Sequence, residues 1–72
     1  MQIARGIVKF FNEERYFGFI ETEDQGDFFF HGNELMAPPL PKRGDVVLFE
    51  IDQDKQGRPK AVRINHLDQG EI

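Results

Sequence analysis

The stretch KFFNEERYFGFIETEDQGDFFFH, residues 9–31, contains seven of the eight phenylalanines in this 72-residue chain. Side chains of a β-strand alternate between its two faces, so a strand through FGFI places Phe17 and Phe19 on one face and the small Gly18 on the other. The later run of three phenylalanines alternates in the same way. This stretch therefore predicts two neighbouring strands that carry aromatic rings on both of their faces.

The rest of the chain continues the strand pattern. Runs rich in Gly, Asn, Asp and Gln separate short alternating segments, as turns do. The prolines in residues 32–43 exclude a long helix or a hydrogen-bonded strand there, and leave one short turn capped by Asn33. The predicted strands are residues 3–12, 16–23, 28–31, 45–52 and 59–65. Five short strands with turns between them predict an all-β barrel or sandwich.

Two of these strands place rings on the same face as charged or titratable side chains. Phe29 shares a face with His31, and Phe17 and Phe19 share one with Arg15. Phenylalanine is ordinarily a core residue, whereas a solvent-facing group of rings is typical of a binding surface. Because a base offers a π-face and a phosphate offers a charge, rings alternating with cations favour single-stranded nucleic acid as the ligand.

Composition bounds the class of protein. The length allows one domain, expected over residues 1–72 with a core over about residues 3–67. The absence of cysteine excludes a disulfide scaffold and favours the cytoplasm, and no apolar run has the length of a signal peptide or membrane span. With no serine, no cysteine and two histidines, the chain is expected to be no enzyme and to hold no metal or cofactor. The net charge of -4 opposes nucleic-acid binding, which usually requires a basic surface.

Four segments resemble the motifs of bacterial cold-shock domains. GIVKFFN (6–12), RYFGFI (15–20) and DFFFH (27–31) look like the strand-one, RNP1-type and RNP2-type motifs of that family, and PKAVRI (59–64) looks like its last strand. The resemblance implies a five-stranded antiparallel OB-fold barrel that binds single-stranded RNA or DNA, preferably pyrimidine-rich, as an RNA chaperone or antiterminator. A monomer is expected, with strand exchange between two copies as an alternative.

The resemblance also implies a set of contact residues. The positions that match base-stacking residues are Phe10, Phe17, Phe19, Phe29 and His31. The positions that match other contacts are Lys9, Asn12, Arg15 and the partly exposed Phe11. Arg58 and Lys60 belong to a basic cluster near the last strand, which is either a solvated edge or a stripe that contacts the nucleic-acid backbone.

This chain departs from the family pattern at several positions. Phe10 stands in place of a tryptophan, Tyr16 in place of a glycine, and Gly32 in place of a phenylalanine. The missing ring at Gly32 predicts weaker binding, which Gly32→Phe is expected to restore. Phe10 also has the same parity as Val8, which belongs in the core, so the first strand is expected to bulge between them.

One rival function uses the same rings. A protein-binding OB or SH3-like barrel also presents an aromatic patch, and it grips a peptide rather than a nucleic acid. The acidic net charge favours this alternative. An RNA-recognition motif has a similar RNP1 pattern, but it needs two helices that this sequence does not predict.

Overall fold

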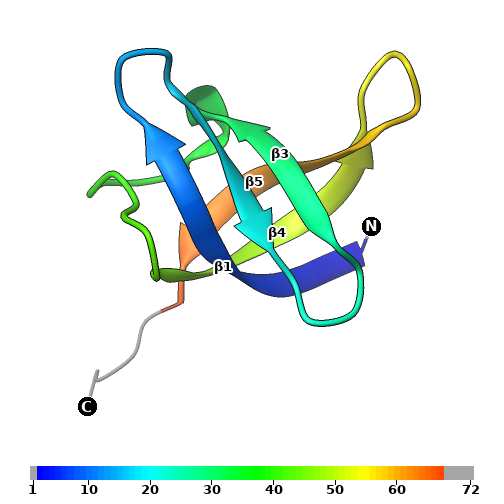
Figure 1. Cartoon of the computed structure of the whole chain (residues 1–72), viewed down its shortest axis with the longest axis horizontal. Helices are drawn as coiled ribbons and strands as arrows, with labels where there is room; N and C mark the ends of the chain where they lie inside the picture. Colours follow the sequence, from blue (N-terminus) through cyan, green and yellow to red (C-terminus); the bar gives the residue numbers. More distant parts are fainter. Residues whose placement is uncertain (1, 68–72) are drawn as a thin grey trace.

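Five strands and one 3-10 turn make up the structure, a computed structural model that describes residues 2–67 (Figure 1). They are β1 (Gln2–Asn12), β2 (Phe17–Glu21), β3 (Asp27–His31), η1 (Gly32–Glu34), β4 (Val46–Gln53) and β5 (Pro59–His66). The strands close into a barrel in the order β1-β2-β3-β5-β4. The predicted five-stranded barrel is confirmed, with one difference: β3 pairs with β5 in parallel, while the other pairs are antiparallel.

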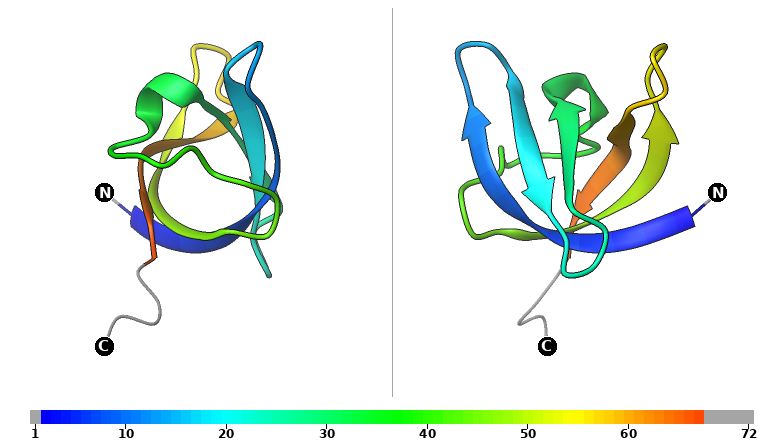
Figure 2. Two further views of the ribbon diagram at one scale, coloured as in Figure 1. Left: turned by 90° about the vertical axis from the view of Figure 1, so that its left-hand side faces the viewer. Right: turned by 45° about the vertical axis from the view of Figure 1, so that its right-hand side comes forward.

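The long strand β1 belongs to both sides of the barrel. Its first half pairs with β4 and its second half with β2, and Figure 2 shows it curving beneath the other strands. The register with β2 shifts between Val8 and Phe10, so Val8 is buried while Phe10 faces solvent. This is the bulge that the shared parity of the two residues predicts.

The barrel interior is filled by apolar side chains from every strand. The fully or nearly buried residues are Val8, Ile20, Phe28, Phe30, Val47, Phe49, Ala61, Val62 and Ile64. The ring centroids of the core residues Phe28 and Phe49 lie 5.2 Å apart. In β3 the burial alternates as predicted, so that Phe28 and Phe30 point inward and Phe29 outward. The core therefore fixes which rings of β3 remain on the surface.

Gly18 allows the strands on each side of β2 to approach closely. A Cβ at this position would collide with the carbonyl oxygen of Phe10 and come within 2.9 Å of the ring of Phe30. Any larger residue would push β1 or the core ring away. The small residue between Phe17 and Phe19 is therefore a packing requirement of the barrel.

The segment between β3 and β4 begins differently from the sequence expectation. His31, rather than Asn33, caps the single 3-10 turn, because its Nδ1 accepts a hydrogen bond of 3.1 Å from the backbone N–H of Asn33. The proline-rich loop is then held to the barrel, where Nε2 of His66 lies 2.8 Å from the carbonyl oxygen of Pro39. β2 also begins one residue later than predicted, because Tyr16 has a φ of 61°, far from the values of a regular strand.

Candidate nucleic-acid interface

Four phenylalanine rings form one continuous group on the outer surface of β1, β2 and β3. The ring centroid of Phe19 lies 5.6 Å from that of Phe10 and 5.7 Å from that of Phe29. Phe17 lies 5.9 Å from Phe10 and 5.8 Å from Phe29. We call these four rings and the neighbouring His31 the aromatic face. Three strands thus hold rings from four sequence positions in mutual contact.

The rings of the aromatic face are supported at their edges and open to solvent. Phe10 and Phe29 are 41% and 39% exposed, and Phe17 and Phe19 between them are half-buried. Most of the pairs meet edge-to-face or tilted, which is the favoured geometry for aromatic rings. Because the neighbours restrict each ring, a flat ligand can stack without first ordering the side chains.

His31 lies beside Phe17 across the β2–β3 ladder. Its Nδ1 accepts the hydrogen bond from Asn33 N, so the neutral ring carries its proton on Nε2. The bond fixes the plane of the imidazole at the η1 end of the aromatic face. This exposed ring can therefore offer both a stacking surface and one hydrogen-bond donor.

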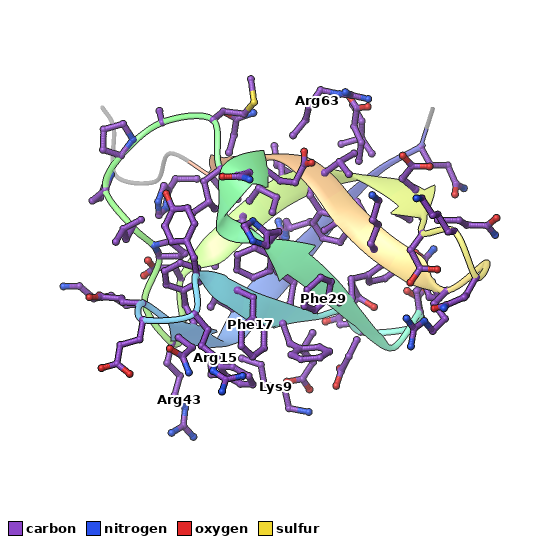
Figure 3. The ribbon with its side chains drawn as sticks, turned by 90° about the horizontal axis from the view of Figure 1, so that it is seen from above. Lys9, Arg15, Phe17, Phe29, Arg43 and Arg63 are labelled. Atoms are coloured by element: carbon purple, nitrogen blue, oxygen red, sulfur yellow. The ribbon has the colours of Figure 1, made fainter. Side chains whose placement is uncertain are left out.

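Three cationic side chains, Lys9, Arg15 and Lys60, lie around the aromatic face, and they differ in whether they have an ion-pair partner. Figure 3 shows Lys9 and Arg15 on the same side of the barrel as Phe17 and Phe29. Lys60 pairs directly with Phe29 in the β3–β5 bridge. Within residues 2–67, neither Arg15 nor Lys60 has an ion-pair partner. Both are available to a phosphate.

Lys9 is partly neutralised by its neighbour. Its Nζ lies 2.8 Å from Oδ2 of Asp27, and this hydrogen bond, with the attraction of the carboxylate, raises the pKa of Lys9. The pair is exposed, so a phosphate can compete with Asp27 for the ammonium group. The face thus offers less positive charge than its three cations suggest.

Two expected contact residues, Phe11 and Asn12, also have structural partners within the barrel. The ring of Phe11 stacks inward on Phe30, with centroids 5.7 Å apart and planes within 6°. Oδ1 of Asn12 accepts hydrogen bonds of 2.9 and 3.0 Å from the backbone N–H groups of Glu14 and Arg15 in the turn that follows β1. Phe11 is therefore a core-edge residue, and Asn12 shapes the loop that carries Arg15.

Two members of the basic cluster near β5, which consists of Lys55, Arg58, Lys60 and Arg63, form ion pairs with acidic side chains. Nε of Arg58 lies 3.0 Å from Oδ2 of Asp54 in the β4–β5 turn, and the backbone N–H of Arg58 is the main cause of a lowered Asp54 pKa. Arg63 forms an ion pair of 2.7 Å with Glu50 and lies on the opposite side of the barrel from Phe17 in Figure 3. Only Lys60 of this cluster joins the aromatic face.

A hollow in the described surface lies away from the aromatic face. It has a volume of about 350 Å³ and is lined in part by Glu21, Glu23 and Asp24. Carboxylates repel phosphate, so the open aromatic face suits a nucleic acid better than this hollow does. Within residues 2–67, no three histidine or acidic side chains gather to hold a metal, and no helix is long and apolar enough to cross a membrane.

Two residues near the aromatic face were not predicted. Tyr16 is 37% exposed, and its ring meets that of His31 edge-to-face at 5.9 Å. Arg43 is exposed and lies on the same side of the barrel as Arg15 in Figure 3. Neither position follows from strand periodicity, because Tyr16 lies in a turn and Arg43 in the proline-rich loop. Their placement depends on tertiary contacts.

Comparison with known proteins gives a consistent result. The 'Cold-shock' DNA-binding domain family matches residues 4–67. The major cold shock protein of Streptococcus pyogenes serotype M6 (strain ATCC BAA-946 / MGAS10394) is 37% identical over 67 residues, which are 90% of this chain and 98% of that protein. The cold shock-like protein of Thermotoga maritima is 39% identical over 62 residues, covering 83% and 92%. The solved structure of Drosophila Unr CSD456 is similar with a TM-score of 0.78 and 29% identity, covering 99% of this chain and 29% of that one.

Proposed function

Since the chain belongs to the 'Cold-shock' DNA-binding domain family, which is a family of nucleic-acid-binding domains and not of enzymes, we propose that it binds single-stranded RNA or DNA by stacking bases on the aromatic face. The observation that supports this most is the group of four phenylalanine rings in mutual contact on the outside of β1, β2 and β3. An interior role cannot explain rings that are 41% and 39% exposed.

The proposed ligand is single-stranded because only unpaired bases can reach the rings. In a duplex the π-faces of the bases are covered by their neighbours, whereas an open strand can turn successive bases onto a flat protein surface. Each stacked base contributes about 1–3 kcal/mol and shows little sequence preference. A preference for pyrimidine-rich strands is part of the proposal and rests on the family resemblance.

Stacking dominates over charge in the proposed mechanism. Arg15 and Lys60 contact phosphates on either side of the aromatic face, and Lys9 does so when the phosphate displaces Asp27. His31 contributes a ring and a donor at the η1 end. The proposed contact residues are thus Lys9, Phe10, Arg15, Phe17, Phe19, Phe29, His31 and Lys60, while Phe11, Asn12 and Arg58 support the elements that carry them.

The proposed cellular role follows from binding alone. A protein that binds only unpaired strands shifts the equilibrium away from weak secondary structure by mass action, without ATP. This is the activity of an RNA chaperone or antiterminator. We place the protein in the cytoplasm as a monomer with one domain; residues 1 and 68–72 of the expected range 1–72 lie outside the described residues.

A titration with fluorescently labelled oligothymidine tests the proposal. The anisotropy of the single strand should rise on adding protein, and an unlabelled single strand should compete where an unlabelled duplex does not. Phe17→Ala should weaken binding by about 1–3 kcal/mol, the contribution of one stacked base. Ile3→Ala is the matched control, since Ile3 is an exposed apolar residue of β1 outside the aromatic face, and it should bind like the wild type.

The peptide-binding alternative predicts the opposite result. It draws support from the net charge of -4 and from the Asp27 carboxylate beside Lys9. A peptide-binding barrel would leave the anisotropy of oligothymidine unchanged at every protein concentration. Equal competition by single strand and duplex would show binding through phosphates instead, and would exclude stacking as the mechanism.

A further inference from the structure

Tyr16 has a backbone conformation that tyrosine rarely adopts. Its φ is 61°, a region in which side chains with a Cβ are disfavoured and glycine is free of strain. The turn holds it there through two hydrogen bonds of 2.7 Å, from Tyr16 N to the carbonyl oxygen of Asn12 and from Gly32 N to that of Tyr16. Glycine would satisfy both bonds equally well. The ring of Tyr16 therefore needs an explanation beyond the shape of the turn.

The ring occupies a space that only a glycine at position 32 leaves open. A Cβ built on Gly32 would lie 2.5 Å from Cδ2 of Tyr16, so any side chain there would displace the ring. The ring meets those of His31 and Phe11 edge-to-face, with centroids 5.9 and 5.8 Å away. Figure 1 shows the β1–β2 turn and η1 together at one end of the barrel. Tyr16 and Gly32 thus form one interlocked contact between two loops.

This contact extends the aromatic face by one ring. Phe29, Phe17 and His31 follow each other from the middle of β3 toward η1, and Tyr16 comes next, against the ring of His31. It is 37% exposed, close to the exposure of Phe29. The preceding residue is Arg15, which has no ion-pair partner in the described residues. A ring open to solvent beside a free guanidinium is the combination that receives a base and its phosphate.

We propose that Tyr16 is a base-stacking residue that adds one nucleotide to the binding site at the η1 end of the aromatic face, an inference that rests on the proposed function. The ring of Tyr16 comes from the β1–β2 turn. It fits because Gly32, the first residue of η1, has no side chain in that space. The sequence alone predicts that Gly32→Phe tightens binding. With Tyr16 over Gly32, the single substitution forces one ring to displace the other and brings no gain.

The chain contains its own probe for this proposal. Tyr16 is the only tyrosine and there is no tryptophan, so the intrinsic emission of the protein comes from the proposed site alone. Unlabelled oligothymidine should quench this emission at the same protein-to-strand ratio at which labelled oligothymidine gains anisotropy. Binding by anisotropy with unchanged tyrosine emission overturns the inference and leaves the proposed function standing. No binding by either signal overturns the proposed function itself.

Exchange of the two residues gives a second, independent test. Tyr16→Gly should stay folded, because glycine accepts the positive φ, and should bind long oligothymidine about 5- to 150-fold more weakly, the range for one stacked base. Tyr16→Phe keeps the ring and should bind like the wild type. The double variant Tyr16→Gly, Gly32→Phe should regain affinity, because the ring then enters the same space from the first residue of η1.

A length series separates stacking from a purely structural role. For the wild type, affinity should rise with oligothymidine length up to a plateau, and for Tyr16→Gly the plateau should come one nucleotide earlier. A folded Tyr16→Gly variant with wild-type affinity and plateau would overturn the inference. Thermal melts recorded beside the titrations confirm that the variants are folded.

Discussion

Substitution of two adjacent rings in β3 separates binding from stability within a single dipeptide. Phe29 is 39% exposed and contacts Phe17 and Phe19 on the aromatic face, while Phe30 is fully buried and stacks on Phe11. Alanine at either position removes the same number of atoms. The two variants differ only in the face from which those atoms are lost, so their effects should be opposite in kind.

The magnitudes follow from burial. A domain of 72 residues has a free energy of unfolding of about 4–11 kcal/mol, at roughly 0.05–0.15 kcal/mol per residue. Phe30→Ala leaves a cavity in the core and should lower it by about 3–5 kcal/mol, which removes much or all of the stability. Phe29→Ala loses its ring contacts with Phe17 and Phe19, each worth about 0.5–1.5 kcal/mol, and should lower it by about 1–3 kcal/mol. The same change should weaken oligonucleotide binding by about 1–3 kcal/mol.

Thermal melts followed by far-UV circular dichroism, together with anisotropy titrations of oligothymidine, measure both quantities. Because Phe30→Ala is expected to be at the limit of folding, Phe30→Leu serves as its folded companion, with a stability loss of about 1 kcal/mol and unchanged affinity. If Phe29→Ala melts far below Phe30→Ala, the register of β3 is wrong by one residue. The inward placement of Phe28 and the outward placement of His31 would then be wrong as well.

Three further substitutions test separate parts of the structure. Asp27→Asn should release Lys9, tighten oligothymidine binding and steepen the slope of log K against log salt by about 0.7, with little change in melting temperature; an unchanged slope would show that Lys9 makes no phosphate contact. Gly18→Ala should lower the free energy of unfolding by about 1–3 kcal/mol, since the added Cβ meets the backbone of Phe10 and the ring of Phe30. A thermal melt with the wild-type melting temperature would contradict that packing. The hydrogen bond from Arg63 holds the pKa of Glu50 below its ordinary value of 4.5, so this pair stabilises the fold above that pH and ceases to do so as the pH falls through the lowered pKa. The melting temperature of Glu50→Gln should therefore be below that of the wild type at pH 7, and the two should be equal at a pH below the lowered pKa. The same difference in melting temperature at both pH values would refute the pairing.

Side-chain alternation explains the part of the site that the sequence predicted. It separated Phe29 from Phe30, and it required the bulge between Val8 and Phe10 that the structure contains. These inferences succeed because the two-residue period is a local property of any strand, and the buried face then fixes the register. Together they placed the rings of the aromatic face on the outside of the barrel.

The remaining features depend on contacts between residues far apart in the sequence. The parallel pairing of β3 with β5 closes the barrel, and no local pattern indicates it. Lys9 of β1 pairs with Asp27 of β3, 18 residues further along the chain, so strand periodicity did not show that its charge is partly neutralised. The contact of Tyr16 with Gly32 joins two turns, and the sequence showed it only as two separate departures from a family pattern.

The salt dependence of oligothymidine binding tests stacking on the aromatic face most directly. Each phosphate contact to a single strand contributes a slope of about -0.7 to log K against log salt. With Arg15 and Lys60 as the free cations and Lys9 held by Asp27, the slope should be shallow, about -1 to -2, while the affinity stays measurable at high salt. A slope steeper than roughly -4, or binding that disappears at high salt, would show that phosphates rather than rings carry the affinity and would contradict stacking as the mechanism.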